Sequence, residues 1–296
     1  MKVGIPRALL YHSFGEIWVN FLGELGLDYI LSPETNKEIV KRGIMLSVDE
    51  SCFSSKVYLG AVDWLIPRCD VIFAPRYEII GFREDMCPRI FGMWDVTKRT
   101  FPTAKFLHAD INVLQLKRER DAFVNIGEQL GFDKEKSLHA YETAVAKFKE
   151  AKLARLAKQE TLLNEPGLKI LIVGHSYNVK DAHIGRGILD FFAKNEIAVI
   201  HAGLIDPCRA KQKTRVYWTF NADLLDGIEK YKDFVDGIVL VTTFPCGPDS
   251  IFNELVLRTI KDKPILSLMV DELDATAGLQ TRLESFVDIL QARSHK

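Results

Sequence analysis

The chain has 296 residues, enough for two domains of ordinary size that each bury a core of their own. Hydrophobic residues make up 47% and charged residues 27%, and 39 basic residues nearly balance 40 acidic ones, so no overall field favours nucleic acid or an anionic membrane as a partner. The N-terminus lacks the apolar core of a signal peptide and no stretch reaches the roughly 18 to 20 apolar residues of a membrane span, so we expect a cytoplasmic protein.

The first third of the chain predicts an N-terminal α/β lobe over residues 1–113. Two segments, "SFGEIWVNFLGELG" and "KVYLGAVDWLI", have apolar residues at helical spacing. Four short apolar runs between turn residues predict strands: "KVGI", "LDYILS", "DVIFAP" and "KFLHADI". This alternation of strands and helices is typical of right-handed βαβ crossovers in a parallel sheet.

Residues 114–166 predict a helical linker. "ERDAFVNIGEQLG" and the longer "DKEKSLHAYETAVAKFKEAKLARLAKQETLL" are rich in Ala, Lys, Glu and Leu and nearly lack β-branched residues. Pro166 and Gly167 are expected to end the second, long helix.

Residues 167–296 predict a C-terminal α/β lobe on the same plan. Its four strand candidates are "LKILIVGH", "IAVIHAG", "DGIVLVTTF" and "KPILSLMV", with helical segments between them. Two similar lobes with parallel, four-stranded sheets therefore describe most of the chain.

Five cysteines are candidates for chemistry, because a disulfide framework is not expected in a reducing compartment. Three of them, Cys52, Cys87 and Cys246, follow strands or precede helices, at the edge of a parallel sheet where ligands bind. If the lobes face each other across a cleft, three thiolates meet there. The sequence has no CxxC pair for zinc, whereas an iron–sulfur cluster accepts widely spaced thiolates. Buried cysteines that only pack remain the alternative.

Several motifs resemble, in order and spacing, the 2-hydroxyacyl-CoA dehydratase D-component family, and in particular its small branch related to acyl-CoA dehydratase activases and to double-cubane cluster proteins. They are "GIPRALLYH", "LSPETNKEIVKRGI", "VDESCFSSKVYLG", "MCPRIFG", "FPCGPDS" and "VDELDATAGLQTRLESFVD". The resemblance covers nearly the whole chain. It implies two flavodoxin-like (Rossmann-like) lobes and a 4Fe-4S cluster held by Cys52, Cys87 and Cys246, with one iron left open.

The resemblance also implies an activity and partners. An ATP-dependent activator protein would supply low-potential electrons under anaerobic conditions, and the substrate would be a 2-hydroxyacyl-CoA or another small molecule that is hard to reduce. A double cubane resembles a six-ligand site, which the five cysteines of one chain do not fill. A homodimer or heterodimer is expected by the same resemblance. Leu273 stands where the family frequently has a histidine, so the proton-transfer role of that histidine does not carry over.

Three further residues are candidates for catalysis: Lys56, His175 and Tyr177. Lys56 follows Cys52 by four residues, so its ammonium can offset the charge of a cluster, or it is a solvated lysine in the first turn of a helix. His175 and Tyr177 lie in "VGHSYNVKDAHIGRG", which resembles the "GRPYN" turn of the family; a histidine here can act as a general acid, or the segment only shapes the turn.

The remaining candidates have plainer alternatives. Cys69 immediately precedes a strand and is expected to pack, whereas Cys208 is a loop cysteine that is either incidental or a reserve ligand. Arg7 faces either an anion or a nearby carboxylate.

No Walker A motif and no GxGxxG occur, so ATP hydrolysis and dinucleotide binding are not supported. Two further functions stay open besides a reductase or dehydratase. One is a non-catalytic cluster carrier or electron-transfer partner, and the other is a metal-free, two-lobe protein that binds a small anion.

Overall fold

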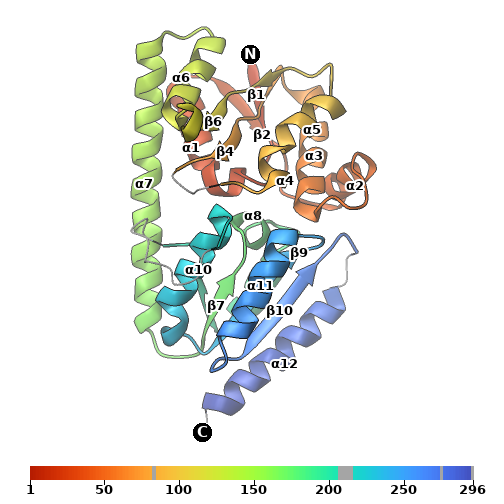
Figure 1. The fold of residues 1–296 in the computed structure, drawn as a ribbon, viewed down its shortest axis with the longest axis vertical. Coiled ribbons are helices and arrows are strands. Elements are labelled where there is room, and N and C mark those ends of the chain that lie inside the picture. The colour runs from red at the N-terminus through yellow and green to blue at the C-terminus, as the bar shows by residue number, and fades with distance from the viewer. Residues whose placement is uncertain (82–84, 206–215, 274–275, 295–296) are drawn as a thin grey trace. The chain divides into compact units, whose positions relative to one another are not determined.

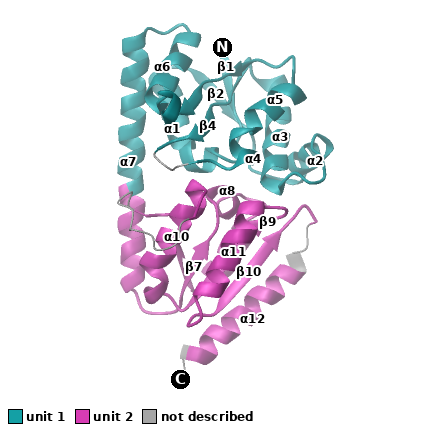
Figure 2. Ribbon diagram, viewed as in Figure 1, with its two compact units in different colours: residues 1–152 teal, residues 153–296 magenta. Residues whose placement is uncertain are grey.

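A computed structural model describes residues 1–81, 85–205, 216–273 and 276–294. The chain forms two compact units, residues 1–152 and 153–296 (Figure 2). The boundary between them falls inside the long helix α7 (Lys134–Asn164), which therefore contributes residues to both units. No helix in the described ranges combines the length and apolar character needed to cross a bilayer.

Unit 1 contains the parallel sheet that the sequence predicts. Its strand order is β2-β1-β3-β5, and each of the four strands lies in one of the four predicted runs. The fourth run, "KFLHADI", is split: its second half forms β6, which pairs with the unpredicted β4 in a separate two-stranded sheet. The strands are β1 (Lys2–Ile5), β2 (Asp28–Leu31), β3 (Val71–Phe73), β4 (Arg76–Ile79), β5 (Phe106–Leu107) and β6 (Asp110–Asn112).

In the described part of unit 1, six α-helices precede α7, and two of them pack backbone to backbone. A Cβ atom on Gly43 would lie 1.9 Å from the carbonyl oxygen of Lys56, and one on Gly60 would lie 2.0 Å from that of Ile39. Glycine is required at both points of contact, because any side chain would separate α2 from α3. The helices are α1 (Tyr11–Glu24), α2 (Lys37–Met45), α3 (Phe53–Leu65), α4 (Pro88–Phe91), α5 (Met93–Thr100) and α6 (Glu119–Gln129).

Unit 2 repeats the topology of unit 1. Its four parallel strands, all predicted, have the order β10-β9-β7-β8. Numbered by their place in each unit, both sheets have the order 2-1-3-4, which is the beginning of the flavodoxin-like order, so the predicted fold class is confirmed. The strands are β7 (Lys169–Val173), β8 (Ala198–His201), β9 (Gly237–Thr243) and β10 (Ile265–Val270); the helices are α8 (Ser176–Val179), α9 (Arg186–Lys194), α10 (Thr219–Tyr231), α11 (Gly247–Thr259) and α12 (Thr276–Ser294) (Figure 1).

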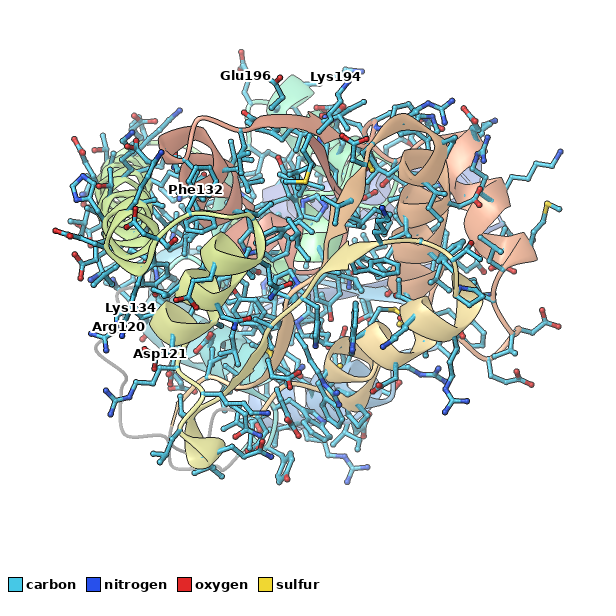
Figure 3. The ribbon with its side chains drawn as sticks, turned by 90° about the horizontal axis from the view of Figure 1, so that it is seen from above. Arg120, Asp121, Phe132, Lys134, Lys194 and Glu196 are labelled. Atoms are coloured by element: carbon cyan, nitrogen blue, oxygen red, sulfur yellow. The ribbon has the colours of Figure 1, made fainter. Side chains whose placement is uncertain are left out.

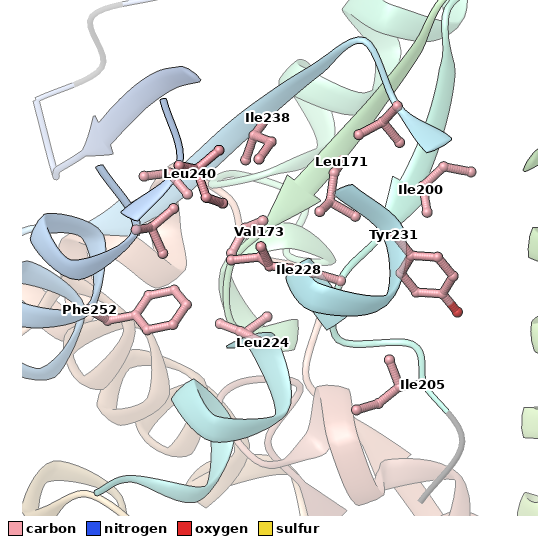
Figure 4. Close-up of a cluster of buried hydrophobic side chains, with 14 residues drawn as sticks. Leu171, Val173, Ile200, Ile205, Leu224, Ile228, Tyr231, Ile238, Leu240 and Phe252 are labelled. Carbon is pink, nitrogen blue, oxygen red and sulfur yellow. The ribbon is translucent and has the colours of Figure 1, made fainter. Parts of the chain in front are cut away.

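Both faces of the second sheet are buried, as parallel sheets require. Along β7, Leu171 and Val173 point into a core formed with α10 and α11 (Figure 4), whereas Ile170 and Ile172 point to the opposite core, formed with α9 and α12. All seven residues of β9 are buried. The interior of this sheet is therefore mainly apolar, with the buried polar residues Thr242 and Thr243 at the carboxyl end of β9.

The carboxylate of Glu119 joins the first half of α7 to the rest of unit 1 through two tyrosine hydroxyls. The Tyr77 hydroxyl donates to Oε1 of Glu119 at 2.8 Å, and the Tyr141 hydroxyl on α7 donates to Oε2 at 2.8 Å. Trp18 Nε1 donates to the oxygen of Tyr77 at 3.3 Å. Burial raises the pKa of Tyr77 well above its ordinary value, and the charge of Glu119 raises it further, so this phenol remains a donor at all ordinary pH values.

We expect Glu119→Ala to lower the free energy of unfolding of unit 1 by about 2 to 3 kcal/mol, because it leaves two phenol donors in the interior without their charged acceptor. Urea unfolding followed by tryptophan fluorescence measures this, since three of the four tryptophans, Trp18, Trp64 and Trp94, lie in unit 1. The control is Asp121→Ala on the same helix, whose side chain is 51% exposed at the surface (Figure 3). Equal unfolding midpoints for the two variants would contradict this role of Glu119.

Candidate metal centre in unit 2 and the cysteine positions

A buried polar group of unit 2 lies where two neighbouring strands end. His175 follows β7, and Cys246 and Asp249 follow β9. These strands pair in parallel, from Ile170 with Gly237 to Val173 with Leu240. They are also the first and third strands of the unit, between which the chain connections diverge to opposite sides, and this is the switch point where open α/β sheets bind ligands.

The polar atoms of the three side chains lie close together. The ligand atoms of His175, Cys246 and Asp249 all lie within 4.8 Å of one another. His175 Nε2 lies 2.7 Å from Oδ1 of Asp249, with each side chain 4% exposed, and Asn221 Nδ2 donates to the same oxygen at 2.9 Å. Burial by itself would raise the pKa of Asp249, but His175, Asn221 and Cys246 outweigh it, and the net shift is downward. The carboxylate is therefore charged at neutral pH.

Polar atoms of this group are left over for a ligand. His175 Nδ1, Asp249 Oδ2 and Asn221 Oδ1 are buried and have no hydrogen-bond partner within the described part of the chain. The His175 ring is fixed by stacking on Tyr177, with centroids 4.9 Å apart, and by Phe220 at 5.9 Å. A histidine held by a carboxylate through one ring nitrogen, with the other nitrogen open, is the arrangement typical of metal-binding histidines. One nitrogen, one sulfur and one oxygen donor can hold a metal ion here.

The three predicted cluster ligands share one local geometry. Cys52, Cys87 and Cys246 are the N-cap residues of α3, α4 and α11, and each has an extended backbone. Each cysteine carbonyl accepts hydrogen bonds from its own helix, for example from Ser55 N and Lys56 N at Cys52. Cys52 Sγ also lies 2.8 Å from the hydroxyl of Ser55. Backbone N–H groups at a helix start can stabilise a negatively charged ligand, and all three cysteines occupy this position.

Pro88 and Pro248 help to fix two of these caps. Pro88 is the first residue of α4, so it restricts Cys87 to the extended backbone that an N-cap needs. Pro248 occupies the first turn of α11 after Cys246. Cys52 and Cys87 belong to unit 1 and Cys246 to unit 2.

The other residues that the sequence analysis singled out differ in their exposure and in their partners. Lys56 is 4% exposed, so its interpretation as a solvated lysine is wrong, and Tyr177 is 7% exposed beside His175. Arg7 pairs with Glu34 at 3.1 Å, which is the structural alternative considered for it. Leu273 is exposed. Cys208 lies outside the described residues.

Cys69 contrasts with the three N-cap cysteines. Its sulfur donates to the carbonyl oxygen of Leu65 at 3.3 Å, and a Cβ atom on Gly4 would lie 2.6 Å from it, so it packs directly beneath β1. Burial raises the pKa of its thiol, which disfavours the thiolate needed for metal binding.

Sequence reasoning missed two members of the buried group, Asp249 and Asn221. Asp249 was readable in the "CGPD" segment, since a residue in the first turn of a helix that follows a strand points toward the switch point. Asn221, on α10, had no such signal, because nothing local in "WTFNADLL" shows that its amide reaches Asp249.

A flavodoxin-like unit that gathers a thiol, an imidazole and a carboxylate at its switch point defines the chain as an α/β protein with a candidate metal- or ligand-binding site. The chain belongs to the family described as "CoA enzyme activase uncharacterised domain (DUF2229)", whose model matches residues 2–205. This agrees with a relationship to the acyl-CoA dehydratase and activase families. No curated protein matches the chain.

Among solved structures, the chain is similar to the SBP FpvC from Pseudomonas aeruginosa in complex with Ni²⁺, with 10% identity, a TM-score of 0.30 and coverage of 99% of this chain and 96% of that one. It is also similar to a Mn-bound mutant of the periplasmic metal binding protein from Candidatus Liberibacter asiaticus, with 12% identity, a TM-score of 0.30 and coverage of 98% and 100%. At these TM-scores the likenesses support no conclusion about the chain.

We expect Asp249→Asn to lower the free energy of unfolding of unit 2 by about 3 kcal/mol at pH 7, because it removes the charged partner of a buried histidine. Since the pKa of Asp249 is lowered, its carboxylate stabilises the fold at neutral pH, and this contribution is lost as the pH falls below the ordinary aspartate value of 3.8. The difference between wild type and variant should therefore shrink in acid. Urea unfolding at several pH values measures it, with Asp190→Asn on the exposed side of α9 as the control; a difference that persists at pH 3 would contradict the pairing.

Proposed function

We propose that the chain is an iron–sulfur protein of the acyl-CoA dehydratase and activase relationship, in which Cys52, Cys87 and Cys246 hold a 4Fe-4S cluster. The observation that carries the proposal is the shared N-cap position of these three cysteines, which the packed Cys69 does not have. Membership in a family described by the words "CoA enzyme activase" supports it independently. The proposal requires thiolates from both units to reach one cluster.

The residues present fit such a group chemically. Iron–sulfur clusters select soft thiolate ligands, and hydrogen bonds to the sulfurs tune their reduction potential. The Ser55 hydroxyl lies at hydrogen-bonding distance from Cys52 Sγ and can supply such a bond. When bound, a three-cysteine 4Fe-4S cluster supplies a one-electron reductant with one iron open to a substrate oxygen.

Three residues of the chain act around this group in the proposal. Lys56, buried in the first turn of α3, supplies an ammonium that offsets the negative charge of the site. His175 carries a proton at Nδ1, the nitrogen left open while Asp249 holds Nε2, and delivers it to an oxygen of the substrate. Tyr177 keeps the imidazole ring in place by stacking.

The reaction class that follows is low-potential reduction or dehydration of a small molecule or acyl-CoA in the cytoplasm of an anaerobic cell. The chain itself carries no Walker A motif, so the proposal includes an ATP-dependent activator protein as electron donor. A non-catalytic cluster carrier would have the same three cysteine ligands but no substrate. It predicts that the activator reduces the cluster and that no acyl-CoA is turned over.

A second candidate function rests on a separate observation. The His175, Cys246 and Asp249 group offers nitrogen, sulfur and oxygen within 4.8 Å, which also fits a single divalent metal ion. In that case Cys52 and Cys87 have no part in metal binding. Acid-labile sulfide is the discriminating quantity, since a mononuclear site contains none.

We expect Cys52→Ser, Cys87→Ser and Cys246→Ser each to lose most of the iron and sulfide, because a hydroxyl is a poor ligand for a cluster iron. Cys69→Ser, the matched control, should keep both. The measurement is iron and sulfide content after anaerobic purification, with EPR of the dithionite-reduced protein for cluster type. If only Cys246→Ser loses iron and the wild type contains no sulfide, the mononuclear site is the correct assignment and the cluster is not. Equal iron retention in all four variants would overturn both proposed metal sites.

A further inference from the structure

Unit 2 contains a cavity that shares no side chain with the candidate metal centre. It has a volume of about 350 Å³ and lies near the carboxyl ends of β7 and β8, where β8 is the last strand of the sheet in the described part of the unit. The second half of α7 forms one wall, and α8 contributes to another. All of the lining residues lie in the range 153–296, so the cavity belongs to this unit alone.

A buried glutamine ties α7 to the edge strand. The side chain of Gln159, itself 3% exposed, donates to the carbonyl oxygens of His201 and Leu204, each at 3.2 Å. Its own oxygen accepts from the backbone N–H of His201 at 2.8 Å. The backbone of His201, the last residue of β8, is thus satisfied by a side chain of α7 rather than by a further strand. The cavity lies between the helix and the strand that this amide connects.

Most of the wall of the cavity is aliphatic. Ile172 and Val179 are 1% and 3% exposed and belong to the core formed with α9 and α12, and Val199 packs against the same core. The aliphatic side chains of the lining are those of Leu162, Ile172, Val179, Val199 and Leu204. Because removing such a surface from water is favourable, this wall favours a ligand with an apolar body.

The basic residues of the lining do not call for an anion. Arg155 and Lys180 have interaction partners of their own, and Lys158 and Lys180 are exposed residues. Long basic side chains can lay their methylene groups along an apolar surface while the charged ends stay in water. These side chains therefore extend the apolar wall.

His201 supplies an uncharged hydrogen-bonding group in the lining. Burial, together with the charge of Lys180, lowers the pKa of its imidazole to about 4, so the ring is neutral at pH 7. A neutral imidazole offers one N–H donor and one acceptor nitrogen. It can pair with a hydroxyl or a carbonyl group of a ligand that carries no charge.

We propose that this cavity binds a neutral, largely apolar organic molecule that carries one hydroxyl or carbonyl group. The apolar body lies against the aliphatic wall, and the polar group pairs with the imidazole of His201. An engineered apolar cavity of about 150 Å³ in another protein holds benzene, so the volume found here suits a molecule of about two fused rings. The site goes beyond the proposed function, because none of its lining residues is a candidate cluster ligand.

The probe for this site is 2-naphthol, and calorimetric titration of the full chain is the measurement. We expect 2-naphthol to bind. The compound 2-naphthoate, with the same rings but a carboxylate, should bind at least about tenfold more weakly, because a charged group loses its hydration in an apolar cavity. Cyclohexanol should also bind at least about tenfold more weakly, because it covers less apolar surface.

Two variants test where the ligand lies. Val199→Phe should abolish binding, because the larger side chain occupies the cavity, and an aromatic residue is well accepted in a strand. His201→Leu should weaken binding about threefold to tenfold, because it removes one hydrogen bond and keeps the wall apolar. Ala198→Val, next to Val199 on β8 but outside the lining, and Lys194→Gln, a surface lysine of α9 (Figure 3), are the controls and should keep the affinity within about twofold.

The unfolding midpoint of each variant in urea shows whether it is folded, and His201→Leu tests the same site if Val199→Phe does not fold. The proposal is overturned by any of three results: no binding at millimolar 2-naphthol, binding of 2-naphthoate as tight as that of 2-naphthol, or unchanged affinity in folded Val199→Phe or His201→Leu protein. None of these results depends on whether the protein contains iron.

Discussion

The parallel pairing of β7 with β9 is the constraint on which the chemistry of unit 2 depends. Every residue of β9 is buried and both faces of the sheet are covered, so the strand interiors are mainly apolar. Polar groups gather at the carboxyl ends of the strands, where β9 ends in Thr242 and Thr243. Because the two strands run in the same direction, the loop that carries His175 and the loop that carries Cys246 and Asp249 open at the same edge of the sheet.

The short helix α8 belongs to two sites at once. His175, its N-cap, and Tyr177 lie at the candidate metal centre, while Ser176, Val179 and Lys180 line a cavity of about 350 Å³ at the ends of β7 and β8. This segment has little freedom to move: the Thr243 hydroxyl lies 3.5 Å from the side-chain oxygen of Asn178, and a Cβ atom on Gly185 would lie 2.2 Å from the carbonyl oxygen of Val179. The turn that positions His175 is therefore closely packed on both sides.

Most of the fold could be predicted from the sequence, because the strands of both sheets are short apolar runs between turn residues, and their alternation with helices permits few topologies. The failures have local causes. β4 and β6 are short strands with polar residues such as Arg76 and Asp110, so their pairing has no apolar periodicity to reveal it. The N-cap cysteines were predictable since prolines and helix starts surround them. The contact between Asn221 and Asp249, 28 residues apart, depends on packing that no local pattern encodes.

The three candidate ligand cysteines share a position at the start of a helix, which their spacing along the chain does not reveal. At an N-cap, the cysteine carbonyl starts the helix while the thiol lies beside the first turn, where backbone N–H groups and the helix dipole stabilise a negative charge. Cys69 follows a helical turn instead, donates to a carbonyl oxygen, and has a raised pKa because it is buried. The same residue type thus donates to a carbonyl oxygen in packed surroundings at one position and begins a helix at the other three. The local backbone position, rather than the separation along the sequence, distinguishes the ligand candidates from the packing cysteine.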